Sequence, residues 1–142
     1  MIIGYRHTGL VVRDLERSIK FYIRLGFELR RRQFEEGSYI ESVTGIDGLS
    51  LEWAKLKGAD GALIELLQYH SHPDENNIEN MPNRLGCSHV SFTVDSIEKT
   101  CDLIKEMGGV IINSPVESPD GGVKVVYCHD FDGVMIELVE ER

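Results

Sequence analysis

Hydrophobic and polar residues alternate in two stretches of the chain that resemble each other. When the sequence is shifted so that His7 falls on His89, the following residues also match without a gap. The further matching pairs are Val12 and Val94, Glu16 and Glu98, and Gly26 and Gly108. The apolar segment Leu63–Leu67 also has a counterpart in Met135–Val139. The pattern therefore predicts one structural module present twice.

The first module is predicted to contain one helix among four strands, the third of which is blurred by the loop Gly45–Gly48 and therefore appears as two segments. Asp14 can cap a helix whose apolar residues recur at helical spacing, and Gly26 can end that helix in a left-handed turn. Period-two patterns and turn residues place the strands around it. The predicted strands are Tyr5–Val12, Phe27–Phe34, Ser38–Val43, Leu51–Leu56 and a strand that leaves the turn Gly58–Gly61 and runs through Tyr69.

The second module repeats this order. Asp95 or Ser96 caps a predicted helix at Ile97–Met107, Pro115–Gly122 is predicted to be a loop, and Asp132-Gly133 a hairpin turn. The predicted strands are Cys87–Val94, Val110–Asn113, Val123–His129 and Val134–Glu140.

The predicted fold class is α+β, with tandem βαβββ modules that pair into a curved sheet. A chain of 142 residues is long enough for one domain with a buried core, so residues 1–142 are taken as one domain. Residues 1–69 form the first module and residues 85–142 the second. The polar segment 70–84, which contains two prolines, is predicted to be the linker.

Composition excludes several classes of partner. The formal net charge is −9 and there is no extended basic stripe, so no nucleic acid is expected. No apolar run is long enough for a membrane span, and the first residues lack the pattern of a signal peptide. Three cysteines without paired spacing favour reduced thiols. We therefore expect a cytoplasmic protein.

Arg30, Arg31 and Arg32 form the one cationic cluster of the sequence. Such a run is usually a solvated strand edge. It could alternatively serve as a local clamp for an anionic substrate, and the sequence leaves both interpretations open.

Four residues carry the candidate chemistry. Glu65 and Glu137 occupy equivalent positions in strands whose two faces are both apolar, where a lone carboxylate costs several kcal/mol unless it is paired, protonated or bound to a metal. His7 and His89 occupy equivalent positions in the first strand of each module. Each alone has a structural explanation, but the repeat brings two imidazoles and two carboxylates together. We therefore predict a metal site formed by His7, Glu65, His89 and Glu137.

This ligand set suits a divalent transition ion, namely Ni, Co, Zn, Mn or Fe, and does not choose among them. An open coordination position would allow the ion to polarise a substrate oxygen.

The sequence resembles the vicinal oxygen chelate superfamily, which has the glyoxalase and bleomycin-resistance fold. The resemblance covers nearly the whole chain. The segments that carry it are His7–Val12, Asp14–Tyr22, Leu25–Phe27, Ile64–Leu66, His89–Val94 and Asp132–Leu138.

Within this superfamily the His, Glu, His, Glu order is similar to that of nickel- or cobalt-dependent glyoxalase I (lactoylglutathione lyase). Extradiol dioxygenases and fosfomycin-resistance enzymes leave the position of Glu65 unfilled, and methylmalonyl-CoA epimerases usually have Gln there. The resemblance implies that Glu137 is both ligand and mobile catalytic base. The Arg and Asn through which glyoxalase I binds glutathione correspond to Val11 and Tyr69, so glutathione is not expected to be held by those contacts.

The resemblance thus implies a metal-dependent lyase or isomerase that takes a proton from carbon next to the carbonyl of a small molecule. One alternative is an epimerase of an acyl-CoA or keto-sugar-like substrate, with Glu41 as a candidate second base or simply a surface residue. Another is a non-catalytic module that binds a small molecule. A homodimer is the common assembly in the family and is expected here.

Overall fold

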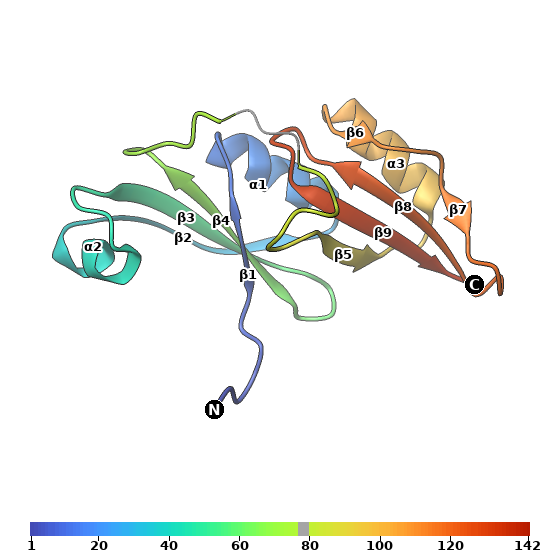
Figure 1. The fold of residues 1–142 in the computed structure, drawn as a ribbon, viewed down its shortest axis with the longest axis horizontal. Coiled ribbons are helices and arrows are strands. Elements are labelled where there is room, and N and C mark those ends of the chain that lie inside the picture. The colour runs from blue at the N-terminus through green and yellow to red at the C-terminus, as the bar shows by residue number, and fades with distance from the viewer. Residues whose placement is uncertain (77–79) are drawn as a thin grey trace. The chain divides into compact units, whose positions relative to one another are not determined.

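The computed structural model describes residues 1–76 and 80–142 and divides into two compact units, Met1–Asn76 and Asn77–Arg142 (Figure 1). The boundary falls within the segment 70–84 that the sequence predicts as a linker, and residues 77–79 of that segment lie outside the described residues. The domain and linker boundaries predicted from the sequence remain a proposal.

The first unit is a four-stranded sheet with two helices. Its strand order is β1-β4-β3-β2, in which β1 and β4 are parallel and the other neighbours are antiparallel. The elements in chain order are β1 (Thr8–Val11), α1 (Leu15–Arg24), β2 (Glu28–Glu36), α2 (Ser38–Thr44), β3 (Ser50–Lys57) and β4 (Leu63–Tyr69).

The second unit repeats this plan. Its main path is β5-β9-β8-β6, again with a parallel pair at one edge, and β7 joins β8. The elements in chain order are β5 (Val90–Thr93), α3 (Ile97–Glu106), β6 (Val110–Ile111), β7 (Val116–Glu117), β8 (Val123–His129) and β9 (Met135–Glu141). The predicted α+β class is confirmed, with a curved sheet in each unit.

The two long helices begin as the sequence predicts. The Asp14 carboxylate accepts from the Arg17 N–H at 3.0 Å, and the Ser96 hydroxyl accepts from the Lys99 N–H at 3.4 Å. Each cap satisfies one of the free N–H groups of a first helical turn. After α1 the chain turns at Gly26, whose φ of 102° is a conformation that favours glycine.

Each long helix covers one face of its own sheet. In the first unit α1 contacts β3 and β4, and the side chains of Ile64 and Leu66 are buried on that face. In the second unit α3 contacts β8 and β9, where Ile136 and Leu138 are buried. Because side chains alternate along a strand, Glu65 and Glu137 lie on the opposite faces.

The segment Ser38–Thr44, predicted as a strand, is the helix α2. Gly37 and Gly45 flank it with φ values of 91° and 73°, so the chain turns sharply at both ends. Within the helix only Ile40 is buried, and it packs in a cluster with Leu49, Leu51 and Trp53. A short segment that contributes one apolar side chain to the core can form a short helix as well as a strand, and tertiary packing decides between them.

A second correction concerns the predicted loop Pro115–Gly122. Val116 and Glu117 pair with Val125 and Lys124, which makes the two-residue strand β7. Two residues are too short for a periodic signal, so the sequence gives no sign of this strand.

The hairpin between β8 and β9 has a buried acid at its base. Asp130 is 2% exposed, and its carboxylate accepts from the N–H groups of Asp132 and Val134, each at 2.9 Å. These bonds satisfy the carboxylate in the interior, and Gly133 supplies a φ of 86° for the turn. The predicted Asp132-Gly133 turn is confirmed.

All three cysteines are free thiols. Cys101 and Cys128 are buried, and burial raises the pKa of the Cys128 thiol to about 12, which leaves it protonated and unreactive at neutral pH. Among the helices of residues 1–76 and 80–142, none has the length and apolar character needed to cross a membrane.

Candidate metal and acid–base site

The first unit brings one predicted ligand pair into contact. Glu65 on β4 lies directly opposite Gly9 on the parallel strand β1, and His7 shares the face of Gly9 just before that strand. The Nε2 atom of His7 is 2.9 Å from Oε2 of Glu65. The parallel pairing of the first and last strands of the unit is what joins these residues, which are far apart in the sequence.

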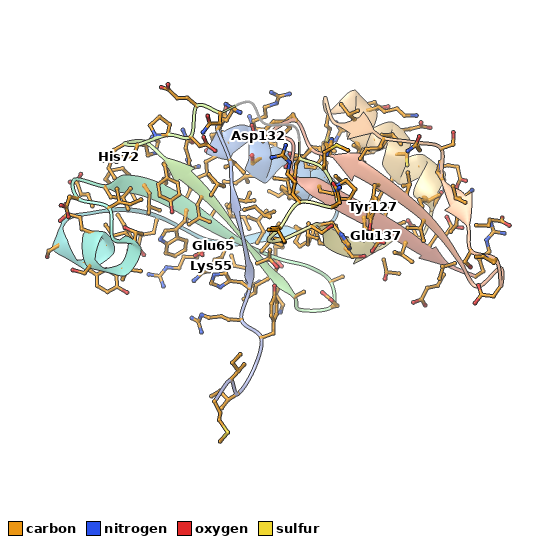
Figure 2. The ribbon with its side chains drawn as sticks, viewed as in Figure 1. Lys55, Glu65, His72, Tyr127, Asp132 and Glu137 are labelled. Carbon is orange, nitrogen blue, oxygen red and sulfur yellow. The ribbon has the colours of Figure 1, made fainter. Side chains whose placement is uncertain are left out.

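Lys55 also reaches this pair. It lies directly opposite Glu65 on β3, and its Nζ atom is 3.5 Å from Oε1 of Glu65 (Figure 2). The Glu65 side chain is 14% exposed, so its carboxylate is partly removed from water, and the Lys55 ammonium is a cation beside it. The Nδ1 atom of His7 is buried with no hydrogen-bond partner in the described part of the chain. His7 therefore presents only its Nε2 atom to the carboxylate.

The second unit contains the equivalent pair. The Nε2 atom of His89 is 3.5 Å from Oε2 of Glu137, whose side chain is 23% exposed. Ser91 lies directly opposite Glu137 on β5 and donates a hydrogen bond from Oγ to the same Oε2 atom at 2.6 Å. Glu137 is thus held by a neutral donor, whereas Glu65 faces a cation.

The other side of His89 is also occupied. Its Nδ1 atom is 3.0 Å from Oγ of Ser88 and 3.4 Å from the hydroxyl of Tyr127, and the His89 and Tyr127 rings lie 5.1 Å apart. Tyr127 takes the position opposite Glu137 that Lys55 takes opposite Glu65 (Figure 2). As in the first unit, the imidazole is oriented with Nε2 toward the acid. Partners on the far nitrogen are the usual means of orienting a ligating histidine.

The spacing within each histidine–glutamate pair is one that a single metal ion could bridge. Two atoms bound at about 2.1 Å to one transition ion lie about 3.0 Å apart at a right angle and about 3.4 Å apart at the tetrahedral angle. The two N–O distances, 2.9 and 3.5 Å, correspond to these values. Neutral imidazole and carboxylate are suitable ligands for the ions predicted from the sequence.

The structure joins the predicted ligands as two pairs. In residues 1–76 and 80–142 no group of three or more His, Cys, Asp or Glu side chains is gathered as a metal cage. The assignment of all four residues to one ion therefore remains a proposal.

The candidate second base, Glu41, is not on a strand as predicted. It lies on α2, and its Oε1 atom accepts from the Gly48 N–H at 2.9 Å, which fixes the loop after the helix. The strand predicted for Ser38–Thr44 was wrong, whereas the role of Glu41, as a second base or as a surface residue, stays a prediction. A carboxylate used to hold a loop is a poor candidate for proton transfer.

Three further residues of the site were not predicted from the sequence, namely Lys55, Ser91 and Tyr127. Ser91 could have been found, since it shares a predicted strand face with His89. Lys55 and Tyr127 depend on which residue of a neighbouring strand lies opposite each glutamate. That register is fixed by the connecting turns and by the buried faces, and composition alone does not reveal it.

Comparison with known proteins identifies the family. Residues 4–138 match the family model of the Glyoxalase/Bleomycin resistance protein/Dioxygenase superfamily, and the chain belongs to that superfamily. The resemblance predicted from the sequence is confirmed.

Several relatives carry the name of one enzyme. A probable lactoylglutathione lyase from Vibrio cholerae is 33% identical over 96% of this chain and 89% of its own length. A lactoylglutathione lyase from Escherichia coli O157:H7 is 31% identical over 96% of this chain and 91% of its own. Among solved structures, a glyoxalase family protein from Bacillus cereus has a TM-score of 0.90 at 26% identity, covering 99% of this chain and 95% of that one.

Proposed function

We propose that this protein is a metal-dependent lyase or isomerase of the glyoxalase I type that removes a proton from carbon next to a carbonyl group. His7, Glu65, His89 and Glu137 would together hold one divalent transition ion, Ni, Co, Zn, Mn or Fe. The observation that carries the proposal is the equivalent pair in each unit, in which a histidine Nε2 atom lies 2.9 or 3.5 Å from a glutamate oxygen. The names of the relatives support the lyase assignment.

Glu137 is proposed as the base. When bound, the ion supplies polarisation of the carbonyl oxygen and stabilises the negative charge that develops there. Glu137 accepts the proton from the neighbouring carbon and returns it to the product. It is the more exposed of the two acids, and its Oε2 atom is held by the Ser91 hydroxyl. Ser91 thus positions a carboxylate that must remain free to turn toward substrate.

Glu65 is proposed as the fixed ligand. It is less exposed than Glu137 and is in contact with both His7 and Lys55. Both carboxylate oxygens of Glu65 have partners, Oε2 with His7 and Oε1 with Lys55, whereas His89 and Ser91 both contact Oε2 of Glu137. Glu65 would thus be a ligand and Glu137 a base, although they occupy equivalent positions. Different environments are known to give two carboxylates of one site different roles.

Glutathione is not proposed as the carrier of the substrate through the contacts used in glyoxalase I. Val11 offers no polar atom on its side chain, and Tyr69 packs against the apolar cluster of Ile40, Leu51 and Trp53. An epimerase would need a second base, and Glu41, which is bound to the Gly48 N–H, does not supply one.

Metal analysis is the first test. Protein purified without chelator and reconstituted with Ni, Co, Zn, Mn or Fe is expected to bind one ion per chain, with weaker binding after substitution of any of the four residues by Ala. Two ions per chain would mean that the two pairs act separately, and no stoichiometric ion would favour a non-catalytic binding module.

Proton abstraction is the second test. In deuterium oxide the metal-loaded protein should incorporate deuterium next to the carbonyl of a small substrate such as methylglyoxal, tested with and without glutathione. Bound metal without exchange in any carbonyl compound tested would contradict the catalytic part of the proposal. The expected homodimer can be checked by sedimentation of the same sample.

A further inference from the structure

Two cations lie side by side on the sheet face that carries Glu65. Arg31 on β2 and Lys55 on β3 are directly opposite each other across the two strands. Both lie over the ring of Trp53, with the Arg31 guanidinium carbon 5.5 Å and the Lys55 Nζ atom 4.8 Å from its centre. Like charges at opposed strand positions destabilise a sheet unless something compensates for them.

The partners of Arg31 do not neutralise it. It donates to the amide oxygen of Gln33 at 2.7 Å, and no carboxylate in residues 1–76 or 80–142 lies within ion-pair distance of it. The adjacent arginines differ, since Arg30 pairs with Glu28 and Arg32 pairs with two acids. The three arginines of the cationic cluster therefore differ in their partners. Arg31 lies on the sheet face that carries Glu65 and has no acidic partner among the described residues.

Lys55 has an acid, but one that the proposed metal would also use. Its Nζ atom is 3.5 Å from Oε1 of Glu65. If Glu65 shares its negative charge with an ion, as the proposed function requires, Lys55 is left as a second cation beside Arg31. A chain with a net charge of −9 then presents a local positive site on this face.

We propose that Arg31 and Lys55 bind an oxyanion of the substrate, a carboxylate or a phosphate group, with the ring of Trp53 beneath them; this inference rests on the proposed function. The planar guanidinium can donate two parallel hydrogen bonds to such a group, and the ammonium adds a point charge. Since Lys55 contacts Glu65, the anionic group lies close to the reacting carbonyl. The substrate class is a small oxo acid or a phosphorylated carbonyl compound.

The rest of the face suits a fixed subsite. Trp53 is 8% exposed and belongs to the cluster with Ile40, Leu49 and Leu51 under α2, so its ring is held in place. In the second unit the position of Lys55 is taken by Tyr127, which contacts His89. The oxyanion subsite is therefore a property of the first unit only.

Trp53 provides the measurement because it is the only tryptophan of the sequence. The full chain, with and without bound metal, is titrated with inorganic phosphate and separately with malonate at constant ionic strength, and tryptophan fluorescence is followed. A saturable change is expected for at least one oxyanion, and the preferred one distinguishes a phosphate from a carboxylate group. Arg31→Gln and Lys55→Gln should each raise the apparent Kd at least tenfold.

Matched variants separate specific binding from loss of charge. Arg30→Gln and Lys57→Gln each remove one exposed cation from the same two strands and should leave the Kd within twofold of the parent. Arg31→Lys keeps the charge but loses the planar donor pair and should weaken binding. Circular dichroism confirms that each variant is folded.

Three outcomes would overturn the inference: an equal response to chloride, an unchanged Kd in Lys55→Gln, or equal weakening in Lys57→Gln. If metal binds and the oxyanion does not, the inference fails and the proposed function stands. If the oxyanion binds and no metal does, the proposed function fails. The inference that the bound oxyanion belongs to a substrate of metal-dependent catalysis then fails as well.

Discussion

The two units place a histidine–glutamate pair at equivalent positions but surround it differently. Opposite the glutamate on the parallel strand, the first unit has Gly9 and the second has Ser91. Opposite it on the antiparallel strand, the first has Lys55 and the second has Tyr127. The histidine, the glutamate and the strand register are therefore the same in both units, whereas the residues next to the glutamate differ. Those neighbours are what can make one carboxylate a fixed ligand and the other a base.

The largest expected effect comes from Glu137→Gln. Loss of a general base costs about 10²- to 10⁴-fold, so turnover should fall by about 10³-fold. The side chain is partly exposed, and the free energy of unfolding should change by less than about 1 kcal/mol. Turnover and deuterium exchange are measured beside a thermal melt. A loss of turnover matched by a comparable loss of fold would contradict a catalytic role.

The same substitution in the other unit should behave differently. Glu65→Gln removes the negative charge of a proposed ligand but keeps an oxygen that can coordinate. The Kd for metal should therefore rise by at least about 10-fold, which is the smallest loss usually seen when a residue that only supports a ligand is removed. Saturating metal should restore most of the turnover. Calorimetric metal titration and turnover against metal concentration check this. If Glu65→Gln and Glu137→Gln lose turnover equally at saturating metal, the two acids have the same role.

Ser91→Ala is expected to have an intermediate effect. It removes the 2.6 Å hydrogen bond to Glu137, and loss of such an outer partner costs about 10-fold or more in activity. The Kd for metal should change less than kcat, because His89 and Glu137 both remain. Thr93→Ala, two residues along the same exposed strand face, is the control. Equal kcat values for the two variants would remove Ser91 from the site.

Glu41→Gln should leave turnover unchanged. Its carboxylate accepts one hydrogen bond, from the Gly48 N–H, on the exposed side of α2. The amide oxygen can accept the same bond, so stability should also change little. Steady-state kinetics with both an aldehyde and a racemisable oxo acid measure the effect. A loss of more than about 10-fold, within the range of general acid–base catalysis, would revive Glu41 as a base.

The smallest effects concern the helix caps, which test how equivalent the two units are in stability. Asp14→Ala and Ser96→Ala should each lower the free energy of unfolding by about 1 kcal/mol. Asp14 should cost slightly more, because its bond is shorter and its charge also favours the positive end of the helix. Urea denaturation measures both. A negligible cost for either would mean that the observed cap does not stabilise its helix.

Sequence periodicity was sufficient for most of the fold because the repeated elements have strong local signals. Asp14, Ser96 and the buried faces of α1 and α3 follow general rules for caps and stripes. Ser38–Thr44 was assigned wrongly since its one buried residue, Ile40, contributes the same volume to the cluster from a helix or from a strand. Long-range packing, which the local pattern does not contain, decided its conformation.

The candidate site also contains residues that the sequence reveals and residues that it does not. His7, Glu65, His89 and Glu137 stand out because a polar residue in an apolar strand is costly and the repeat doubles the signal. Arg31 stands out only as part of the cationic cluster, which the sequence leaves open as a solvated strand edge or an anion clamp, and Lys55 does not stand out at all. Their meaning depends on lying opposite each other over Trp53, and that follows from strand register, which local sequence does not encode.

Each histidine lies just before an edge strand, His7 before β1 and His89 before β5. In the part of the chain that the structure describes, β1 and β5 are edge strands that each pair with one neighbour, as β2 and β6 also are, so they are expected to fray before the inner strands. When such a strand opens locally, the histidine imidazole can move away from the glutamate carboxylate at a modest cost in free energy. An ion that binds both the histidine and the glutamate would stabilise the pairing of the edge strand with the sheet. Amide hydrogen exchange in Thr8–Val11 and Val90–Thr93 would then slow when the ion binds.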